Sequence, residues 1–265
     1  MKLNNLQRHY KRRQRAFTVI ELLVIVVVVA IVAGLLMPQL VGHGHPNRLA
    51  MCRNNMRQLA VAWSMYADDN GKKLVPNIQG GAAGGWVKGS LSWKAVDANT
   101  NLSNLSEGLL GPYVAKILSI YHCPADKSVA DKQGPRVRSC SMNGFVGSSV
   151  YAATGQNVLR MPDFRKPSAT FIFLDEHPDS INDGFMAVVT SAGETNQWHD
   201  LPGSFHVNNG SGLSFADGHA EMHRWTNQTT RLPITKSNAG YPGKPAGPPN
   251  GDLLWAIQHA MNPLP

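Results

Sequence analysis

The first strong pattern in the chain is an almost unbroken apolar run over residues 17–37, which holds a single charged residue, Glu21. At 1.5 Å per residue, a helix over this run would be roughly 30 Å long, enough to cross a hydrocarbon core. Pro38 ends the run and predicts a kink where the helix continues, because proline has no backbone N–H to donate. The pattern therefore predicts a transmembrane helix over residues 17–37.

A second helical pattern follows, over residues 38–67. Its apolar residues recur at intervals of three and four positions, which places them on one face of a helix; they are Cys52, Met56, Leu59, Trp63 and Tyr66. The turn sequence DDNGKK at residues 68–73 predicts the end of this helix. We expect an amphipathic continuation of the membrane helix that packs on the core of its own domain.

The pattern then changes to short β-rich runs, which predicts a globular head over residues 68–232. Strands are expected at 170–175 and 184–190, and a hairpin at 212–225 around Asp217-Gly218, a dipeptide typical of two-residue turns. Such a turn would pair Phe215 with Ala220. A Gly-rich stretch at 79–90 lacks the residue order of a phosphate-binding loop and is expected to be a flexible surface loop.

The last segment, residues 233–265, is rich in proline and glycine and ends in a short helical pattern, DLLWAIQHAM. Asp252 is the expected N-cap of this helix, which would dock either on the head or on a neighbouring molecule. The sequence thus predicts an α+β fold: a long N-terminal helix, half transmembrane and half amphipathic, packed on a C-terminal antiparallel β-sheet domain.

Charge is concentrated at the N-terminus. Residues 1–16 contain six Lys and Arg and no acid, so they carry +6 of the net +8, and the remaining 249 residues carry 19 basic and 17 acidic side chains, or +2. A basic flank on an otherwise nearly neutral chain is typical of the cytoplasmic side of a membrane helix. A nucleic-acid-binding surface would need basic residues spread over the folded part, so we expect no nucleic-acid partner.

Glu21 is the residue that an ordinary membrane anchor does not explain, because a carboxylate inside lipid is costly and usually has a partner. A cleaved secretory signal is also a poor match, since its apolar region is shorter. If the basic leader were removed between Ala16 and Phe17, the new α-amino group would lie one helical turn from Glu21. In a bundle of such helices, Glu21 could pair with the freed amine of the adjacent copy.

The stretch RAFTVIELLVIVVVVAIVAGLLMP resembles the N-terminal signal of type IV pilins and type II secretion pseudopilins. The shared features are a short basic leader, a cut before an aromatic residue and a late proline, although Ala16 stands where that family usually has glycine. The resemblance implies cleavage before Phe17 and its N-methylation by a prepilin peptidase, with Glu21 as the assembly carboxylate.

Later segments are similar to a prepilin-like family that has a His-x9-Asp-Gly element near the C-terminus. They include CRNNMRQLAVAW, YHCPADKS and FHVNNGSGLSFADGHA. The element corresponds to His206 and Asp217-Gly218, which are separated by ten residues here rather than nine. The likeness reaches to about Trp225 and implies a pilin-like role.

Several acidic residues and histidines raise the question of catalysis; they are Asp175, Glu176, His177, Asp179, Asp183, His206, Asp217 and His219. The chain has no H-E-x-x-H and no G-x-S-x-G motif, and on one strand His219 and His223 would stand roughly 13 Å apart. We expect solvated turn residues, no enzymatic activity and no cofactor. The alternative is a structural Ca²⁺ on oxygen ligands from Asp175, Asp179 and Asp183.

Three cysteines follow the membrane segment, where disulfides are permitted. Any pairing leaves one thiol over, and the sequence does not choose among the three pairings. A Cys123–Cys140 bridge would close a short loop, whereas Cys52 lies on the apolar stripe and suits a small core position.

Together these patterns predict a structural subunit of a type II secretion or type IV pilus-like filament. Its expected partners are other copies, other pseudopilins, the prepilin peptidase and the assembly platform. We expect a single-pass inner-membrane protein with a cytoplasmic N-terminus and a periplasmic head, assembled into a filament after processing. The alternative is a membrane-tethered periplasmic ligand-binding or hydrolytic domain with a pilin-like anchor.

Overall fold

The structure is a computed structural model, and it describes residues 19–20, 23–28, 45–188, 197–237, 244–245 and 250–263. The chain divides after His43 into two parts. In the first part the described residues are helical and lie within the expected 17–37 helix. Ala16, Phe17, Glu21 and Pro38 lie outside the described residues. No helix among the described residues combines the length and apolar character needed for a membrane crossing.

Helix α2 (His45–Asp69) confirms the amphipathic pattern. Cys52, Met56, Leu59 and Trp63 are all buried, and Tyr66 packs at the edge of the same core. The helix ends where the turn sequence predicted, because Gly71 takes a positive φ of 64° and the N–H of Lys72 donates to the carbonyl of Ala67. The apolar stripe of α2 therefore packs against the protein's own head.

The central sheet has five strands in the order β5-β3-β4-β7-β8. They are β3 (Cys140–Asn143), β4 (Phe171–Asp175), β5 (Phe185–Met186), β7 (Gly210–Phe215) and β8 (Ala220–Arg224). The sheet is mixed rather than purely antiparallel, which corrects the sequence prediction. The short strand β5 returns to the edge after a loop and pairs parallel with β3, whereas all other neighbours in this sheet are antiparallel.

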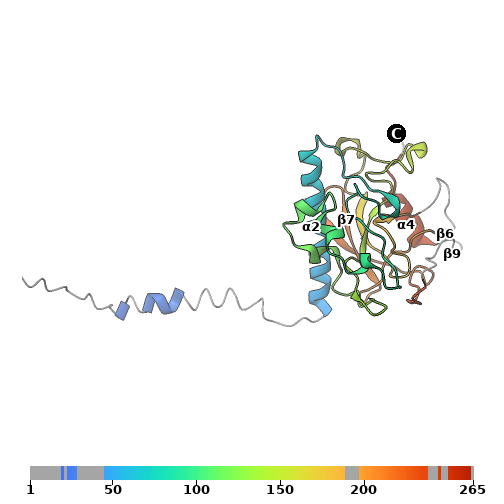
Figure 1. Cartoon of the computed structure of the whole chain (residues 1–265). Helices are drawn as coiled ribbons and strands as arrows, with labels where there is room; N and C mark the ends of the chain where they lie inside the picture. Colours follow the sequence, from blue (N-terminus) through green and yellow to red (C-terminus); the bar gives the residue numbers. More distant parts are fainter. Residues whose placement is uncertain are drawn as a thin grey trace, which may run out of the picture. The chain divides into compact units, whose positions relative to one another are not determined.

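The sheet separates two hydrophobic cores. Helix α2 packs on β7, β8 and β4 and buries Leu59 and Trp63 on one side. Helix α4 (Gly251–Ala260) covers the opposite side, where Leu253 and Ala256 join Leu213 and Trp225. Figure 1 shows α2 and α4 on either side of β7, so the head is a three-layer α/β/α arrangement.

The hairpin of β7 and β8 differs from the sequence prediction by one position. Ser214 pairs with Ala220, and the N–H of Phe215 donates to the carbonyl of His219, so the loop has three residues rather than two. Gly218 has a φ of +91° and its N–H donates to the carbonyl of Phe215, which gives a type I turn followed by a left-handed residue. The expected Phe215–Ala220 pair is therefore wrong by one residue.

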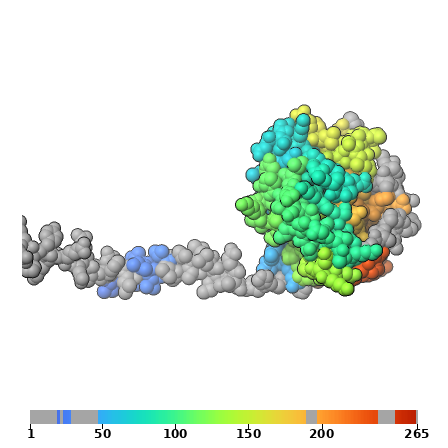
Figure 2. Space-filling model, viewed as in Figure 1, coloured from blue at the N-terminus to red at the C-terminus, as the bar shows by residue number. Residues whose placement is uncertain are grey.

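Along the chain between α2 and β3, residues 70–139 form short turns of helix and one small β-ribbon. Their atoms make up much of the cyan to green surface on the face shown in Figure 2. The helical turns before the sheet are η2 (Gln79–Gly81), η3 (Asp97–Asn99), α3 (Ser103–Ser106), η4 (Gly111–Val114) and η5 (Leu118–Tyr121). The remaining elements are η6 (Ala152–Thr154), η7 (Met161–Asp163), the ribbon of β1 (Val129–Ala130) with β2 (Gly134–Pro135), and that of β6 (Gln197–Trp198) with β9 (Lys244–Pro245).

The Gly-rich stretch at residues 79–90 is anchored rather than a free surface loop. Trp86 is 1% exposed, its ring stacks on Tyr121 at 5.9 Å and lies 5.0 Å from Phe173, and its indole N–H donates to the carbonyl of Gly184 at 3.0 Å. A Cβ on Gly184 would come within 2.7 Å of that indole nitrogen. Gly184, which lies outside this stretch, thus lets the buried tryptophan approach the backbone closely.

The C-terminal helix docks on its own head, which decides between the two expectations for the tail. Its N-cap is Asn250 rather than Asp252, because the Asn250 side chain accepts the N–H groups of Asp252 and Leu253. Asp252 instead accepts the N–H groups of Thr226 and Asn227. Asn143 in β3 donates to the carbonyl of Ala260 at 2.8 Å and fastens the other end.

Candidate metal centre

In the part of the chain that the structure describes, one group of buried side chains has the composition and spacing of a metal site. We call it the four-ligand cluster: Cys52, Cys123, Asp175 and His206. One ligand atom from each residue can be chosen so that all four lie within 4.8 Å of one another. The cluster combines two sulfurs, one imidazole nitrogen and one carboxylate oxygen, which is a donor set that a transition metal prefers.

Each ligand comes from a different segment. Cys52 lies in the second turn of α2, and Cys123 follows the helical turn η5. Asp175 is the last residue of β4, and His206 lies in the turn just before β7, where its carbonyl accepts the N–H of Asn209. Because β4 and β7 are antiparallel neighbours inside the sheet, the end of β4 and the start of β7 place Asp175 and His206 at the same end of these two strands.

The carboxylate of Asp175 is held by three donors. Its Oδ2 accepts the thiol of Cys52 at 3.0 Å and the N–H of Gly212 at 3.0 Å, and its Oδ1 accepts the hydroxyl of Ser139 at 3.1 Å. A Cβ on Gly212 would lie 2.8 Å from the sulfur of Cys52 and 3.2 Å from Oδ2 of Asp175. A glycine at this position therefore lets the strand backbone approach the cluster.

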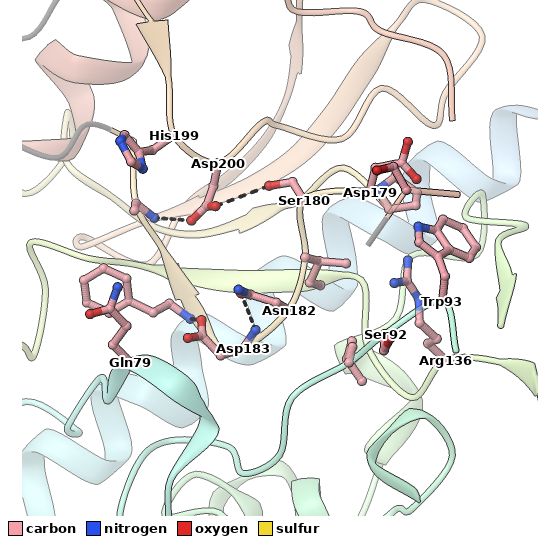
Figure 3. A pocket seen from close by; sticks show the side chains of 16 residues that line it. Gln79, Ser92, Trp93, Arg136, Asp179, Ser180, Asn182, Asp183, His199 and Asp200 are labelled. Carbon is pink, nitrogen blue, oxygen red and sulfur yellow. Dashed lines mark hydrogen bonds between the residues drawn. The ribbon is translucent and has the colours of Figure 1, made fainter. Parts of the chain in front are cut away.

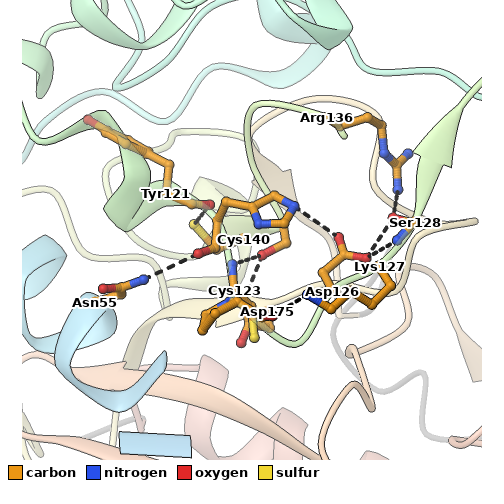
Figure 4. A network of polar contacts seen from close by, with 12 residues as sticks. Asn55, Tyr121, Cys123, Asp126, Lys127, Ser128, Arg136, Cys140 and Asp175 are labelled. Carbon is orange, nitrogen blue, oxygen red and sulfur yellow. Dashed lines mark hydrogen bonds and ion pairs between the residues drawn. The ribbon is translucent and has the colours of Figure 1, made fainter. Parts of the chain in front are cut away.

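Ser139 connects two members of the cluster. Its hydroxyl accepts the backbone N–H of Cys123 at 2.7 Å while it donates to Asp175, and Figure 4 shows Cys123 and Asp175 side by side in this network. The sulfur of Cys123 lies 3.3 Å from Nε2 of His206. The four side chains are thus positioned by hydrogen bonds among themselves and to one neighbouring serine.

The electrostatics of the cluster follow from its burial. The pKa of Asp175 is raised to about 6 by burial, which its hydrogen bonds from Cys52, Gly212 and Ser139 only partly offset. Contact with the Cys123 thiol, burial and the Asp175 charge raise the pKa of Cys52. Contact with Cys52 lowers the pKa of Cys123, but burial and Asp175 leave it raised overall. Burial lowers the pKa of His206, so without a cation the cluster favours thiols and a neutral imidazole.

Four other residues of the expected cluster are not solvated turn residues, which corrects that prediction for them, whereas Asp217 and His219 are exposed as predicted. Glu176, His177, Asp179 and Asp183 are each at most 4% exposed. These side chains fix loops around the sheet. Glu176 accepts a hydrogen bond from the hydroxyl of Ser180, and His177 contacts the carbonyl of Leu232. Asp179 accepts from the N–H and hydroxyl of Thr235, and Asp183 accepts from the N–H groups of Phe185 and Gly80.

The structure does not bring together the three aspartates considered for calcium. Asp175 belongs to the four-ligand cluster, whereas Asp179 and Asp183 bind loop backbone elsewhere. Among the described residues these three carboxylates form no shared group of ligand atoms.

The structure also bears on the cysteine pairings that the sequence left open. All three are buried free thiols, and the Cys123–Cys140 bridge is not formed. Cys140 donates to the carbonyl of Tyr121 at 3.4 Å, while Cys123 faces Cys52 and His206. Cys52 is a buried core residue as expected, but its thiol is a member of the cluster as well.

The two halves of the His-x9-Asp-Gly-like element have different places. His206 precedes β7 and Asp217-Gly218 forms the turn after it, and a strand of six residues spans roughly 20 Å at 3.3 Å per residue. Asp217 is exposed and contacts Nδ1 of His219 at 2.5 Å. The two parts of the element therefore lie at opposite ends of β7: His206 is a ligand of the four-ligand cluster, and Asp217-Gly218 forms the hairpin turn. They do not form one site.

A separate cavity of about 300 Å³ lies beside β5 and β6. Figure 3 shows Trp93, Arg136, Asp179 and Asp200 around it. The Arg136 guanidinium lies 4.6 Å from the ring centroid of Trp93. The acids at this cavity are mostly engaged by the chain itself, since Asp200, for example, accepts the N–H of Ala187 at 2.7 Å.

The four-ligand cluster was not expected from the sequence. Its ligands are spaced by 71, 52 and 31 positions along the chain, so none of the short ligand spacings of zinc motifs is present. The sequence offered only three cysteines and one histidine at the start of a strand as possible metal ligands. These residues alone do not show which of them come together in the fold.

Comparison with known proteins concerns the N-terminal part. Residues 11–37 match the prokaryotic N-terminal methylation motif. The chain is 33% identical over 60 residues to type II secretion system core protein G of Pseudomonas aeruginosa. This alignment covers 23% of the chain and 42% of the relative, so less than half of that protein's length is matched. No solved structure matches the chain significantly.

These matches confirm the resemblance carried by the stretch around Phe17 and Glu21, whereas the wider likeness through His206 and Asp217-Gly218 stays a prediction. The chain therefore carries a prepilin-type N-terminal methylation motif and is similar, over 60 residues, to a core protein of type II secretion.

Proposed function

We propose that this chain is a structural subunit of a type II secretion or type IV pilus-like filament, anchored in the inner membrane with its head in the periplasm. The observation that carries the proposal is the methylation motif at residues 11–37. A prepilin peptidase would cut between Ala16 and Phe17 and methylate the new amino group. The assembly platform, other copies and other pseudopilins are the partners of the processed subunit.

The arrangement of α2 supports assembly through the preceding segment. The apolar stripe of α2 is buried in its own head, so it does not offer a surface to other subunits. In contrast, the described apolar side chains of 19–20 and 23–28 are 48–77% exposed. An apolar helix surface of this kind needs lipid or other helices around it.

Glu21 would set the register between the N-terminal helices of neighbouring subunits. In a bundle of processed subunits, its carboxylate would accept a hydrogen bond from the methylated amine of Phe17 on an adjacent copy. A charge inside lipid is tolerated when such a partner is present, and the pair would align neighbouring helices at one fixed offset.

Two measurements on the full chain in its native host test the proposal. Mass spectrometry of the membrane-extracted protein should find an N-terminus at Phe17 with one added methyl group. Glu21→Gln should abolish cross-links between the N-terminal helices of copies, whereas Glu107→Gln, an exposed acid on the head, should leave them unchanged. An intact Met1 on the mature protein, or full cross-linking in Glu21→Gln, would contradict assembly by this route.

The alternative is a membrane-tethered periplasmic ligand-binding or hydrolytic domain, and the 300 Å³ cavity beside Trp93 and Arg136 is the observation that favours it. Under this alternative, Glu21→Gln would leave the function of the head intact. Several acids at the cavity already accept backbone N–H groups, so they act there as loop-fixing acceptors. The filament subunit is therefore the function that we favour.

A further inference from the structure

We propose that the four-ligand cluster binds one structural zinc ion. Zinc is bound in proteins by cysteine sulfur, histidine nitrogen and carboxylate oxygen, and closed sites with four protein ligands are structural. Calcium and magnesium require oxygen ligands throughout, and iron–sulfur clusters usually require four thiolates. The donor set of two thiolates, one imidazole and one carboxylate therefore selects zinc among the common ions.

The geometry suits a tetrahedral ion. Metal–ligand bonds of about 2.0–2.3 Å place neighbouring ligand atoms about 3.3–3.8 Å apart in a tetrahedron. In the structure Cys123 Sγ and His206 Nε2 are 3.3 Å apart, Cys52 Sγ and Asp175 Oδ2 are 3.0 Å apart, and every pair is within 4.8 Å. The longest of these separations, at most 4.8 Å, must shorten by about 1 Å to reach the tetrahedral range.

The surroundings of the cluster resemble a supported metal site. Ligating groups are normally oriented by hydrogen bonds from a surrounding shell of residues. Ser139 fixes Asp175 and the backbone of Cys123, and the N–H of Gly212 fixes the second oxygen of Asp175. These contacts leave the two sulfurs and Nε2 directed at one another.

Binding is balanced in charge and protons. The thiols of Cys52 and Cys123 each release one proton to solvent, and Zn²⁺ accepts two thiolates, the Asp175 carboxylate and the neutral His206 ring. The complex carries one net negative charge, which the N–H of Gly212 and the hydroxyl of Ser139 offset. A small hollow of about 140 Å³ has His206 in its wall.

The main competing chemistry is a disulfide between Cys52 and Cys123. Such a bond would remove the thiol donor from the buried Asp175 carboxylate and leave that carboxylate without one of its three hydrogen bonds. It would also give no role to Nε2 of His206 beside the sulfur of Cys123. Zinc uses all four groups, and this is why we favour the ion.

The position of the site gives it a structural consequence. Cys52 is the one ligand on α2, and the other three belong to the head. A bound zinc ion would therefore fasten the helix that follows the N-terminal segment to the head near the start of that helix. This inference does not depend on processing or filament assembly.

The test uses the full-length protein in detergent, loaded with zinc and freed of excess metal by gel filtration. Elemental analysis should find about one zinc per chain. Cobalt in place of zinc should give the visible bands of a tetrahedral site and a near-ultraviolet thiolate band. Cys52→Ala and His206→Ala should each lose the metal, whereas Cys140→Ala is the matched control and should keep it, because Cys140 is a buried thiol outside the cluster.

The cobalt spectrum of the unaltered protein keeps the test valid if a variant fails to fold. The proposal is overturned by zinc well below one per chain together with no thiolate band. It is equally overturned by an intact mass two hydrogens lighter that maps to a Cys52–Cys123 bond. Equal metal loss in Cys140→Ala and Cys52→Ala would also contradict it, because that result would mean that the metal depends on general core packing.

Discussion

The thiol of Cys52 donates to Oδ2 of Asp175 at 3.0 Å, across 123 positions of sequence. This contact joins the second turn of α2 to the last residue of β4, so one residue of the helix stripe and one residue of the strand meet in the same buried site. The stripe would form a core with any small apolar residue at position 52. The contact with a buried carboxylate indicates that this cysteine has a chemical role in addition to packing.

Ser139→Ala is expected to weaken zinc binding without removing a ligand. The variant deletes the hydroxyl that accepts the Cys123 N–H and donates to Asp175, and loss of such supporting contacts typically lowers metal affinity about 10–100-fold. Competition with a chromophoric chelator measures the affinity. Ser119→Ala removes an exposed hydroxyl nearby in sequence and should change the affinity less than twofold; equal losses in the two variants would count against the role of Ser139.

Zinc should also stabilise the folded head. An ion that binds the folded state alone adds about 2.7 kcal/mol at a free concentration 100 times its Kd. The melting temperature of the full chain should therefore rise with zinc and fall after chelation, as followed by circular dichroism. His206→Ala should melt at the same temperature with and without zinc. A zinc-dependent rise that persists in this variant would place the binding elsewhere.

The carboxylates of Asp200, which lines the 300 Å³ cavity, and of Glu176 predict a pH dependence of stability. Burial raises the pKa of Asp200 to about 7, which the N–H of Ala187 opposes and the charge of Asp183 reinforces. Burial and Asp200 also raise the pKa of Glu176, which faces Arg138. Because an unfolded aspartate titrates near 4, the folded state binds the extra proton between about pH 4 and pH 7.

Stability should therefore fall as pH rises through this window, by on the order of 2 kcal/mol between pH 5 and pH 8 for Asp200 alone. Urea unfolding at several pH values measures the effect. Asp200→Asn should flatten the curve in part, with remaining slope of the same sign from Glu176 and Asp175, whose pKa values burial also raises. An unchanged slope in this variant would mean that Asp200 does not carry the dependence.

The elements that could be predicted from the sequence are those specified by local periodicity. The stripe from Cys52 to Trp63 predicted α2, and Asp217-Gly218 marked the hairpin turn to within one residue. The error of one residue came from Gly218, since a left-handed residue after a type I turn adds a position that composition alone does not distinguish. The parallel pairing of β5 depends on a non-local return of the chain.

The four-ligand cluster could not be predicted for a related reason. Cys52 and Asp175 come together only because α2 packs on the end of β4, and no local pattern reports that packing. The same holds for Glu176 and Asp183, which as turn residues were expected in solvent. They are buried because loops fold over the sheet and supply N–H and hydroxyl donors.

Trp86 is expected to be among the strongest contributors to stability in the segment before the sheet. Trp86→Ala would leave a cavity between Tyr121 and Phe173 and should cost about 3–5 kcal/mol. Trp86→Phe keeps most of the volume but loses the donor to the Gly184 carbonyl, and should cost about 1–2 kcal/mol. Denaturant unfolding monitors both. If Trp86→Ala cost less than 1 kcal/mol, the segment would be the loose loop that the glycines suggested.

Asn250 and Asp252 provide a direct comparison of two cap assignments. Asn250 accepts the N–H groups of Asp252 and Leu253 and donates to the hydroxyl of Thr229, so Asn250→Ala should destabilise the head by about 0.5–2 kcal/mol. Asp252 accepts from the backbone of Thr226 and Asn227, so Asp252→Ala should also destabilise the head, through the loss of those hydrogen bonds rather than through the helix end.

Asn54→Ala is the control, because Asn54 is exposed in the middle of α2 and should change stability by less than about 0.5 kcal/mol. The decisive readout is hydrogen exchange of the Asp252 and Leu253 amides. Their protection should fall in Asn250→Ala and persist in Asp252→Ala, whereas unchanged protection in Asn250→Ala would contradict Asn250 as the cap.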